Sequence, residues 1–333
     1  MNMRNWLQQV VDSEIKKPMP ILSFPCVQLQ NISVKELISS SDRQAEGMKA
    51  VADRVDSLAA VSFMDLSLEA EAFGAEIKVV DDEVPTVTGV LVKNMEDAES
   101  LQVPTIDSGR LSIYIEGLEK AMELIKDRPV LAGVIGPFSL AGRLVDVSTA
   151  MKYCKRQPEL LHTVLRKVTD FLIEYIKEYK KIGANGIAMA EPLAGLLSPR
   201  FAKEFSEPYV REIADAVRDE NFIMVYHNCG DATIAQVDSI AATNCDAYHF
   251  GNAINMKEML EKFPSDVPVM GNIDPASQFT SGTVESMEKA TRELLEECAA
   301  HKNFIISSGC DIPPVANWDN IDTFFSTVKK FYE

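Results

Sequence analysis

Short runs of apolar, often β-branched residues alternate along this chain with longer stretches in which apolar residues recur at helical spacing. Short buried runs predict strands, and a 3.6-residue period predicts amphipathic helices. The predicted strands are residues 20–27, 60–64, 130–135, 186–190, 223–226, 246–250, 267–271 and 304–308. The clearest predicted helices are residues 158–182, 199–218 and 284–299. This alternation predicts an α/β fold of the (β/α)₈ TIM-barrel type.

Two segments depart from the alternation. The first 18 residues predict an N-terminal helical extension outside the barrel, and residues 77–93 predict a hairpin inserted after strand 2, with polar turn residues at 81–83. The chain has no internal repeat and no linker rich in Pro, Gly and Ser. We therefore expect one TIM-barrel domain over residues 1–333.

The composition narrows the classes of partner. The chain has 333 residues and a formal net charge of -17. A phosphate backbone needs a basic footprint, so this charge disfavours nucleic acid and anionic membrane surfaces. No stretch approaches the roughly 20 apolar residues of a membrane span, and the N-terminus lacks a signal-peptide core. We expect a cytoplasmic protein whose six cysteines are reduced thiols or metal ligands.

Three soft ligands follow two of the predicted strands. His227 and Cys229 come at the end of the fifth strand, and Cys310 follows the eighth. Residues i and i+2 of an extended chain point to the same side, so His227 and Cys229 can reach one ion. The two strands are not neighbours, so the ion would lie near the centre of the barrel mouth. An imidazole and two thiolates leave one position open on tetrahedral zinc, the pattern of a catalytic site.

Other polar residues stand at the same ends of the predicted strands. They are Cys26, Asp65, Glu191, Asn272 and Asp274. Active sites of TIM barrels lie at the C-terminal ends of the strands, so all of these are candidates. Cys26 could instead be a buried core residue with no part in the active site.

Several segments resemble the uroporphyrinogen decarboxylase superfamily. The resemblance rests on residues 183–199, on the turn Gly271-Asn-Ile-Asp-Pro275, on residues 64–74 and on residues 133–139. It extends from about residue 60 to the C-terminus and implies the TIM-barrel fold.

The chain departs from the decarboxylases at two motifs. The family's arginine-rich motif after the first strand is replaced by Pro25-Cys-Val-Gln-Leu-Gln-Asn31, and its late histidine by Gly309-Cys310-Asp311. An anionic tetrapyrrole would lack its counter-charges, and unpaired buried charge is costly. Tetrapyrrole decarboxylation is therefore kept only as an alternative.

The His-x-Cys…Cys pattern is similar to that of the methylcobalamin:coenzyme M methyltransferases of this superfamily. The resemblance implies His227, Cys229 and Cys310 as Zn²⁺ ligands, a corrinoid (methylcobalamin) supplied by a partner protein, and a thiol such as coenzyme M. Methyl transfer from a methoxy, methylamine or thioether donor, or a non-enzymatic zinc-stabilised carrier, are the alternatives. A homodimer is also an expectation.

Each remaining candidate has two interpretations. Glu191 could fill the open zinc position or act as an acid or base, or it could bond to nearby backbone. Asp65 could orient a ligand histidine, or it could pair with an Arg or Lys. Asn272 and Asp274 could contact a cofactor, or they could fix the turn after strand seven. The helix start at residues 138–142 is a candidate anion pocket for a sulfonate.

Overall fold

The computed structural model describes residues 1–333 and contains nine strands. They are β1 (Ala60–Val61), β2 (Glu76–Lys78), β3 (Thr86–Thr88), β4 (Val130–Ile135), β5 (Gly186–Ala190), β6 (Ile223–Asn228), β7 (Ala247–Phe250), β8 (Val269–Ile273) and β9 (Phe304–Ser308).

Helices make up most of the rest of the chain. They are α1 (Met3–Asp12), α2 (Cys26–Gln30), α3 (Val34–Ile38), α4 (Ser41–Arg54), α5 (Leu68–Ala72), α6 (Met95–Ser100), α7 (Leu111–Leu124), α8 (Pro137–Val145), α9 (Val147–Arg156), α10 (Pro158–Lys181), α11 (Pro199–Phe205), α12 (Glu207–Val217), α13 (Val237–Ala241), α14 (Met256–Leu260), α15 (Val284–Cys298) and α16 (Trp318–Tyr332). Two 3₁₀ turns (Ala194–Leu196 and Thr233–Gln236) and a π-helical turn (Pro275–Thr280) complete them. None of these helices combines the length and the hydropathy that crossing a lipid bilayer requires.

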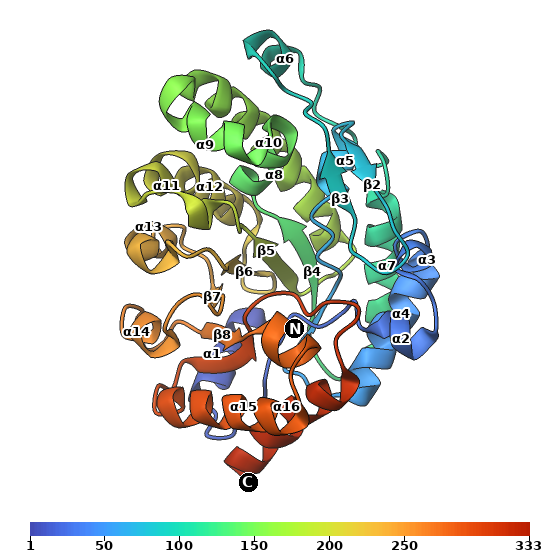
Figure 1. Cartoon of the computed structure of the whole chain (residues 1–333), viewed down its shortest axis with the longest axis vertical. Coiled ribbons are helices and arrows are strands. Elements are labelled where there is room, and N and C mark those ends of the chain that lie inside the picture. Colours follow the sequence, from blue (N-terminus) through green and yellow to red (C-terminus); the bar gives the residue numbers. More distant parts are fainter.

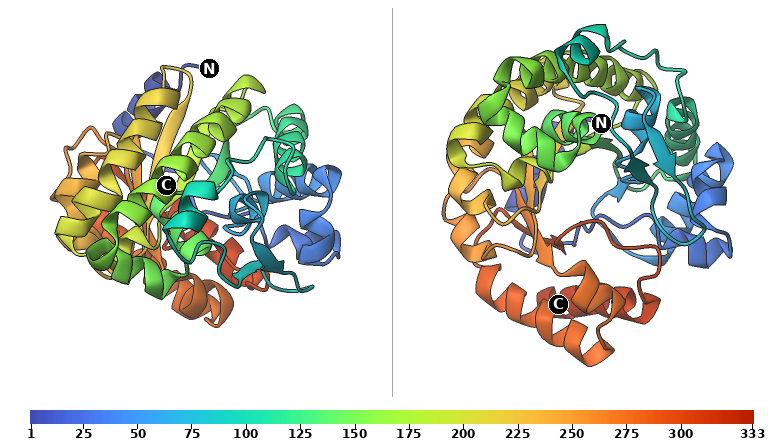
Figure 2. Two further views of the ribbon diagram at one scale, coloured as in Figure 1. Left: turned by 90° about the horizontal axis from the view of Figure 1, so that it is seen from above. Right: turned by 45° about the horizontal axis from the view of Figure 1, so that its top comes forward.

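Seven strands form one parallel sheet in the order β1-β4-β5-β6-β7-β8-β9. The sheet is curled, and helices ring its outer side, so the architecture is TIM-like (Figures 1 and 2). Strands β4, β5 and β9 have the bounds that the apolar runs predict. They are buried along their whole length, as parallel strands covered on both faces should be.

The prediction of a strand at residues 20–27 is wrong. This segment has no regular secondary structure up to Ser23 and then turns into α2. It still fills the gap between β9 and β1, because the Met19 amide donates to the Ile306 carbonyl and Leu58 donates to the Pro18 carbonyl. Prolines at positions 18 and 20 have no N–H to donate, so the segment cannot build a regular ladder.

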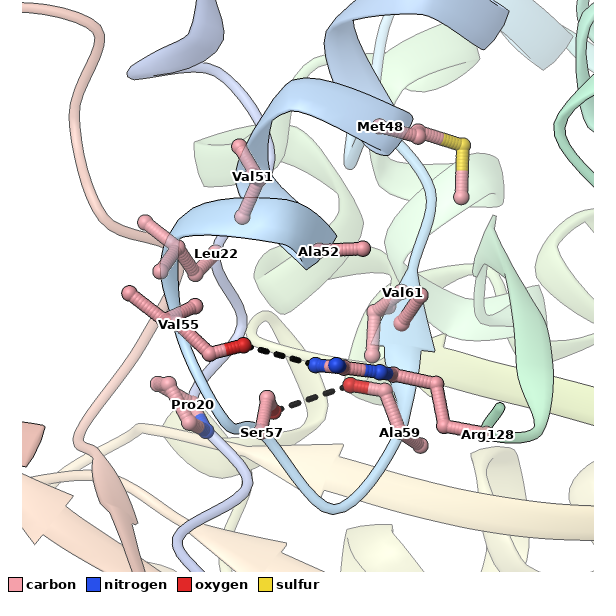
Figure 3. A pocket seen from close by; sticks show the side chains of 11 residues that line it. Pro20, Leu22, Met48, Val51, Ala52, Val55, Ser57, Ala59, Val61 and Arg128 are labelled. Carbon is pink, nitrogen blue, oxygen red and sulfur yellow. Dashed lines mark hydrogen bonds between the residues drawn. The ribbon is translucent and has the colours of Figure 1, made fainter. Parts of the chain in front are cut away.

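Side-chain packing holds this segment in place of an eighth strand. Pro20 and Leu22 line a small gap together with Val51 of α4 and Val55, the residue after α4. The Arg128 guanidinium also lines this gap and donates to the Val55 carbonyl at 2.7 Å (Figure 3). The closed eight-stranded barrel predicted from the sequence is thus a seven-stranded curled sheet completed by an irregular segment.

The N-terminal extension covers the amino ends of the strands. The helix α1 was predicted, and three of its residues, Met3, Leu7 and Val10, belong to an inner apolar cluster of 16 residues. The cluster includes Ile223 and Ile305, the first or second residues of β6 and β9. A separate cluster of 81 residues fills the space between the sheet and the surrounding helices. The interior of the sheet is therefore packed at its lower end and is open for a site only at the carboxyl ends.

Two other predictions are refined. The hairpin is present as antiparallel β2 and β3, paired Glu76 with Thr88. The single helix predicted over residues 199–218 is broken into α11 and α12 at Ser206. Pro208 explains the break, because a proline lacks the N–H for an i−4 bond and clashes with the preceding turn.

Candidate metal centre

The register of the sheet places two histidines side by side. β6 runs to Asn228 and so includes His227, whereas the predicted strand stopped at residue 226. His227 pairs with Ala190 of β5 on one side and with His249 of β7 on the other. All three lie at or near the carboxyl ends of buried strands, so both imidazoles are at the mouth of the sheet.

Cys310 reaches the same place from the other side of the mouth. It follows β9, which is separated from β6 by β7 and β8. The chain then passes across the mouth to α2, where the Gln28 amide donates to the carbonyls of Pro314 and Ala316 (Figure 1). Cys310 thereby contacts His227 and Cys229, which precede it in the sequence by 83 and 81 positions.

His227, Cys229 and Cys310 form a group whose ligand atoms all lie within 4.8 Å of one another. Cys310 Sγ is 3.5 Å from His227 Nε2 and 3.9 Å from Cys229 Sγ. In a tetrahedral zinc site, with Zn–S of about 2.3 Å and Zn–N of about 2.0–2.1 Å, two sulfurs lie about 3.8 Å apart and sulfur and nitrogen about 3.5 Å apart. The spacing of the three side chains therefore fits a zinc ion.

A chain of hydrogen bonds orients His227. Its Nδ1 lies 2.8 Å from His249 Nδ1, His249 Nε2 lies 2.7 Å from Ser307 Oγ, and that hydroxyl donates to the Met19 carbonyl at 2.8 Å. Because the Ser307 hydroxyl donates its proton to the Met19 carbonyl, the Ser307 oxygen must accept a hydrogen bond from His249 Nε2–H. His249 Nδ1 is then an acceptor, since burial lowers the pKa of His249 well below its usual value and keeps it neutral. His227 consequently carries its proton on Nδ1, and its Nε2 lone pair faces the two sulfurs.

The Cys310 thiol donates a hydrogen bond to Cys229 Sγ. The hydrogen bond from Cys310 lowers the pKa of Cys229, and the same bond, together with burial, raises the pKa of Cys310 to about 12. Both cysteines are half-buried. The Cys229 side chain lies against Gly251, where an added Cβ would be 2.5 Å from Cys229 Cβ.

Glu191 lies at the N-terminus of α8. Its carboxylate accepts from the amides of Phe138 at 3.0 Å and Ser139 at 2.7 Å, and from the Ser206 hydroxyl at 3.3 Å. Burial raises the pKa of Glu191 to about 7, although these hydrogen bonds oppose the shift. The helix start considered for a sulfonate is thus filled by Glu191. Its local bonds match the backbone-bonded interpretation of this residue.

Asp65 is part of a different network. Its carboxylate accepts from Arg110 at 2.7 Å, from the Tyr114 hydroxyl at 2.8 Å and from Ser67 Oγ at 2.6 Å. The residue that contacts His227 through hydrogen bonding is His249 instead. The ion-pair interpretation therefore describes Asp65 in this structure.

Asn272 and Asp274 hold local backbone. The Asn272 amide donates to the carbonyls of Gly251 and Ile254, at 2.8 and 3.0 Å. Asp274 caps the π-helical turn by accepting from the amides of Ala276 and Ser277. Asn272 thus also fixes Gly251, the residue against which Cys229 packs.

The sequence alone did not place His249 or Ser307 beside His227. A weak signal was present, because His249 and Ser307 stand two residues after Ala247 and Ile305 of the inner apolar cluster and so point to the same side of their strands. The remaining thiols, Cys154, Cys245 and Cys298, are buried as expected of core residues, and Cys26 is buried as well.

The sequence matches a protein-family model named Uroporphyrinogen decarboxylase (URO-D) over residues 20–331. The chain belongs to the uroporphyrinogen decarboxylase family. Membership extends the resemblance noted above to the segment from residue 20, which includes the irregular stretch in place of the eighth strand. Members of the family are enzymes.

The chain is similar to proteins of two kinds. Methylcobamide:CoM methyltransferases MtbA from Methanosarcina acetivorans and Methanosarcina mazei are 27% and 28% identical, each over 80% of this chain and 78% of the relative. A uroporphyrinogen decarboxylase from Coxiella burnetii is 26% identical over 82% of this chain and 77% of its own length. The solved structure of a methyltransferase from Methanosarcina mazei superposes with a TM-score of 0.88 at 23% identity, covering 100% of this chain and 99% of that one. That superposition supports the fold.

Proposed function

We propose that this protein is a zinc-dependent methyltransferase that moves a methyl group between the corrinoid of a partner protein and a thiol such as coenzyme M. The similarity to two methylcobamide:CoM methyltransferases supports the reaction class. The observation that carries the proposal is the convergence of His227, Cys229 and Cys310, whose ligand atoms all lie within 4.8 Å of one another.

The overall step is balanced without a further reagent. A C–S bond forms between the thiol sulfur and the methyl carbon, the Co–C bond breaks, and cobalt keeps the electron pair. The thiol proton is released. Zinc, when bound, would keep the substrate thiol deprotonated, since an ordinary thiol with a pKa of about 8.5 is mostly protonated at neutral pH.

The residues of the chain prepare this centre. The His249–Ser307 chain holds His227 with its Nε2 lone pair free. Cys229 and Cys310 supply the negative charge that favours a thiolate nucleophile over the hydrolytic water typical of a three-histidine site. Glu191 anchors α8 beside the site and ties β5 to β6, because its amide donates to the His227 carbonyl.

The test combines metal analysis with methylcobalamin turnover. We expect one zinc per chain and loss of methylcobalamin colour only when coenzyme M is added. Cys310→Ala should lose both the zinc and the activity, whereas Cys154→Ala, which changes a buried thiol on α9, should retain both. Full activity in zinc-free protein would overturn the proposal.

The alternatives have separate readouts. A panel of methoxy, methylamine and thioether donors with cob(I)alamin tests transfer in the other direction. Incubation with uroporphyrinogen tests decarboxylation, the alternative supported by the similarity to the uroporphyrinogen decarboxylase of Coxiella burnetii. A zinc-stabilised carrier would have a closed site, so the visible spectrum of cobalt-substituted protein would not change when thiol is added.

A further inference from the structure

One half-buried arginine of this chain has no ion-pair or hydrogen-bond partner. Four arginines are half-buried, namely Arg110, Arg128, Arg143 and Arg218. Three of them form ion pairs: Arg110 with Asp65 and Glu71, Arg128 with Asp127, and Arg218 with Asp246. Arg143 has no carboxylate within 4.0 Å and makes no hydrogen bond, and its Nε is buried without an acceptor.

The environment of Arg143 is costly for a cation. Burial lowers its pKa, and no nearby acid opposes that shift. The chain carries 50 acidic and 33 basic residues, so a carboxylate partner would be easy to supply. A buried charge without a partner destabilises a protein, and in native structures such groups are normally paired or bind a ligand.

Arg143 faces an open hollow of about 300 Å³. The hollow lies between residues 74–76 after α5, residues 87–91 at the exit of the hairpin, and Arg143 in the last turn of α8. Lys93, a second cation without an ion-pair partner, also lines it. The amides of Leu91 and Val92 donate to the Leu144 carbonyl and so hold the hairpin exit against α8.

The donors around the hollow suit an anion. The Gly89 and Val90 amides donate to no atom of the chain, so N–H groups are available beside the two cations. A guanidinium presents a planar set of donors that matches two oxygens of a phosphate or sulfonate. Glu76 is the one acidic residue in the lining, and it does not pair with Arg143.

We propose that this hollow, named here the Arg143 site, binds a phosphate or sulfonate group of a small-molecule ligand. The site is separate from His227, Cys229 and Cys310 and does not depend on the methyl-transfer proposal. The hairpin supplies one wall, which gives this insertion a binding role at the rim of the barrel.

Thermal unfolding and calorimetry with inorganic phosphate and with ethanesulfonate test the proposal. Ethanesulfonate has no thiol with which to bind zinc, and comparing it with phosphate separates sulfonate binding from phosphate binding. Any anion that binds near the metal centre instead would bind Arg143→Met as tightly as the wild-type protein. We expect at least one of the two to bind and to raise Tm, with the same response in Cys310→Ala. Failure of both anions to bind the wild-type protein would overturn the proposal.

The decisive variant is Arg143→Met, which keeps an apolar stem. Loss of the guanidinium should weaken anion binding by roughly tenfold or more, because a charge-assisted bidentate contact is removed. It should also raise the Tm of the ligand-free protein, since an unpaired buried charge is removed. Unchanged anion binding in this variant would show that Arg143 has only a structural role.

Two further variants test the site even if Arg143→Met impairs folding of the protein. Glu76→Gln should strengthen anion binding, because it removes the acid from the lining. Lys93→Met should weaken binding less than Arg143→Met, because Lys93 is exposed. Arg200→Met, at an exposed arginine on α11, is the matched control and should leave binding unchanged. Weaker anion binding in Glu76→Gln, or stronger binding in Lys93→Met, would contradict the proposal.

Discussion

The orientation of a single imidazole at this centre depends on residues from two other strands and the N-terminal segment. His227 donates through Nδ1 to His249, and the proton order is set by Ser307, whose hydroxyl is committed to the Met19 carbonyl. Partners of this kind fix the tautomer and the ring position of a ligand histidine. The irregular segment that replaces the eighth strand thereby contributes to the metal centre through Met19.

A prediction follows for His249. His249→Phe removes the acceptor for His227 Nδ1–H, so we expect zinc affinity to fall by roughly 10–100-fold. His249→Gln can still accept from His227 and should recover part of the affinity. Chelator competition measures the affinity, and ¹⁵N NMR of the zinc-free protein measures the His227 tautomer. An unchanged tautomer in His249→Phe would contradict the proposed proton order.

A second prediction concerns Gly251. A Cβ at this position would lie 2.5 Å from Cys229 Cβ and 2.6 Å from its Cα, so Gly251→Ala must displace the Cys229 backbone. A displacement of this kind should weaken zinc binding by about tenfold or more, because coordination tolerates errors of only about 0.2 Å. Retained wild-type affinity in a folded Gly251→Ala protein, checked by circular dichroism, would show that the loop can adjust.

At this scale the sequence predicted part of the site. The alternation of an extended chain was sufficient to group His227 with Cys229, and Cys310 joined them because it also ends a strand. The partner of Glu191 was not predictable in the same way. Its contact with the Phe138 and Ser139 amides depends on how α8 is placed against β5, which is a tertiary feature.

Among the elements, α8 depends on Glu191 for its first turn. The carboxylate satisfies two amides that would otherwise be buried without acceptors. Glu191→Leu should therefore destabilise the protein by roughly 2–4 kcal/mol, and Glu191→Gln by less, because an amide oxygen can still accept. Urea unfolding measures both. Equal stability of the Leu variant and the wild type would show that another group caps α8.

The elements that sequence analysis placed well are those that packing alone determines. Strands β4, β5 and β9 are apolar runs with no proline, and their predicted bounds are those observed. The two largest errors involve proline. Pro18 and Pro20 prevent a ladder in the first segment, and Pro208 divides α11 from α12. Both segments have the expected pattern of apolar residues. That pattern does not show where a proline removes the backbone N–H that a strand or helix needs.

For the whole molecule, Glu69 should make stability depend on pH. Burial raises its pKa to about 8, and one of its oxygens has no hydrogen-bond partner. Between about pH 5 and 8 the unfolded chain is ionised at this residue while the folded protein is neutral, so folding takes up a proton. Stability should fall as pH rises through this window, by up to about 4 kcal/mol.

Glu69→Gln is the matching variant, because glutamine resembles the neutral acid. We expect the variant to gain stability relative to the wild type as the pH rises from 5 to 8. Urea unfolding of both proteins at the two pH values measures this difference in unfolding free energy. A difference that is the same at both pH values would mean that Glu69 is ionised in the folded protein.

The helix α1 has a consequence for the order of events in turnover. It closes the lower end of the sheet interior, so under the proposed function both reactants must use the same entrance. A small thiol has to arrive before the bulky corrinoid protein covers that entrance, and its methylated form can leave only after the protein departs. We expect compulsory-order kinetics with the thiol first, and inhibition by excess corrinoid protein that more thiol relieves.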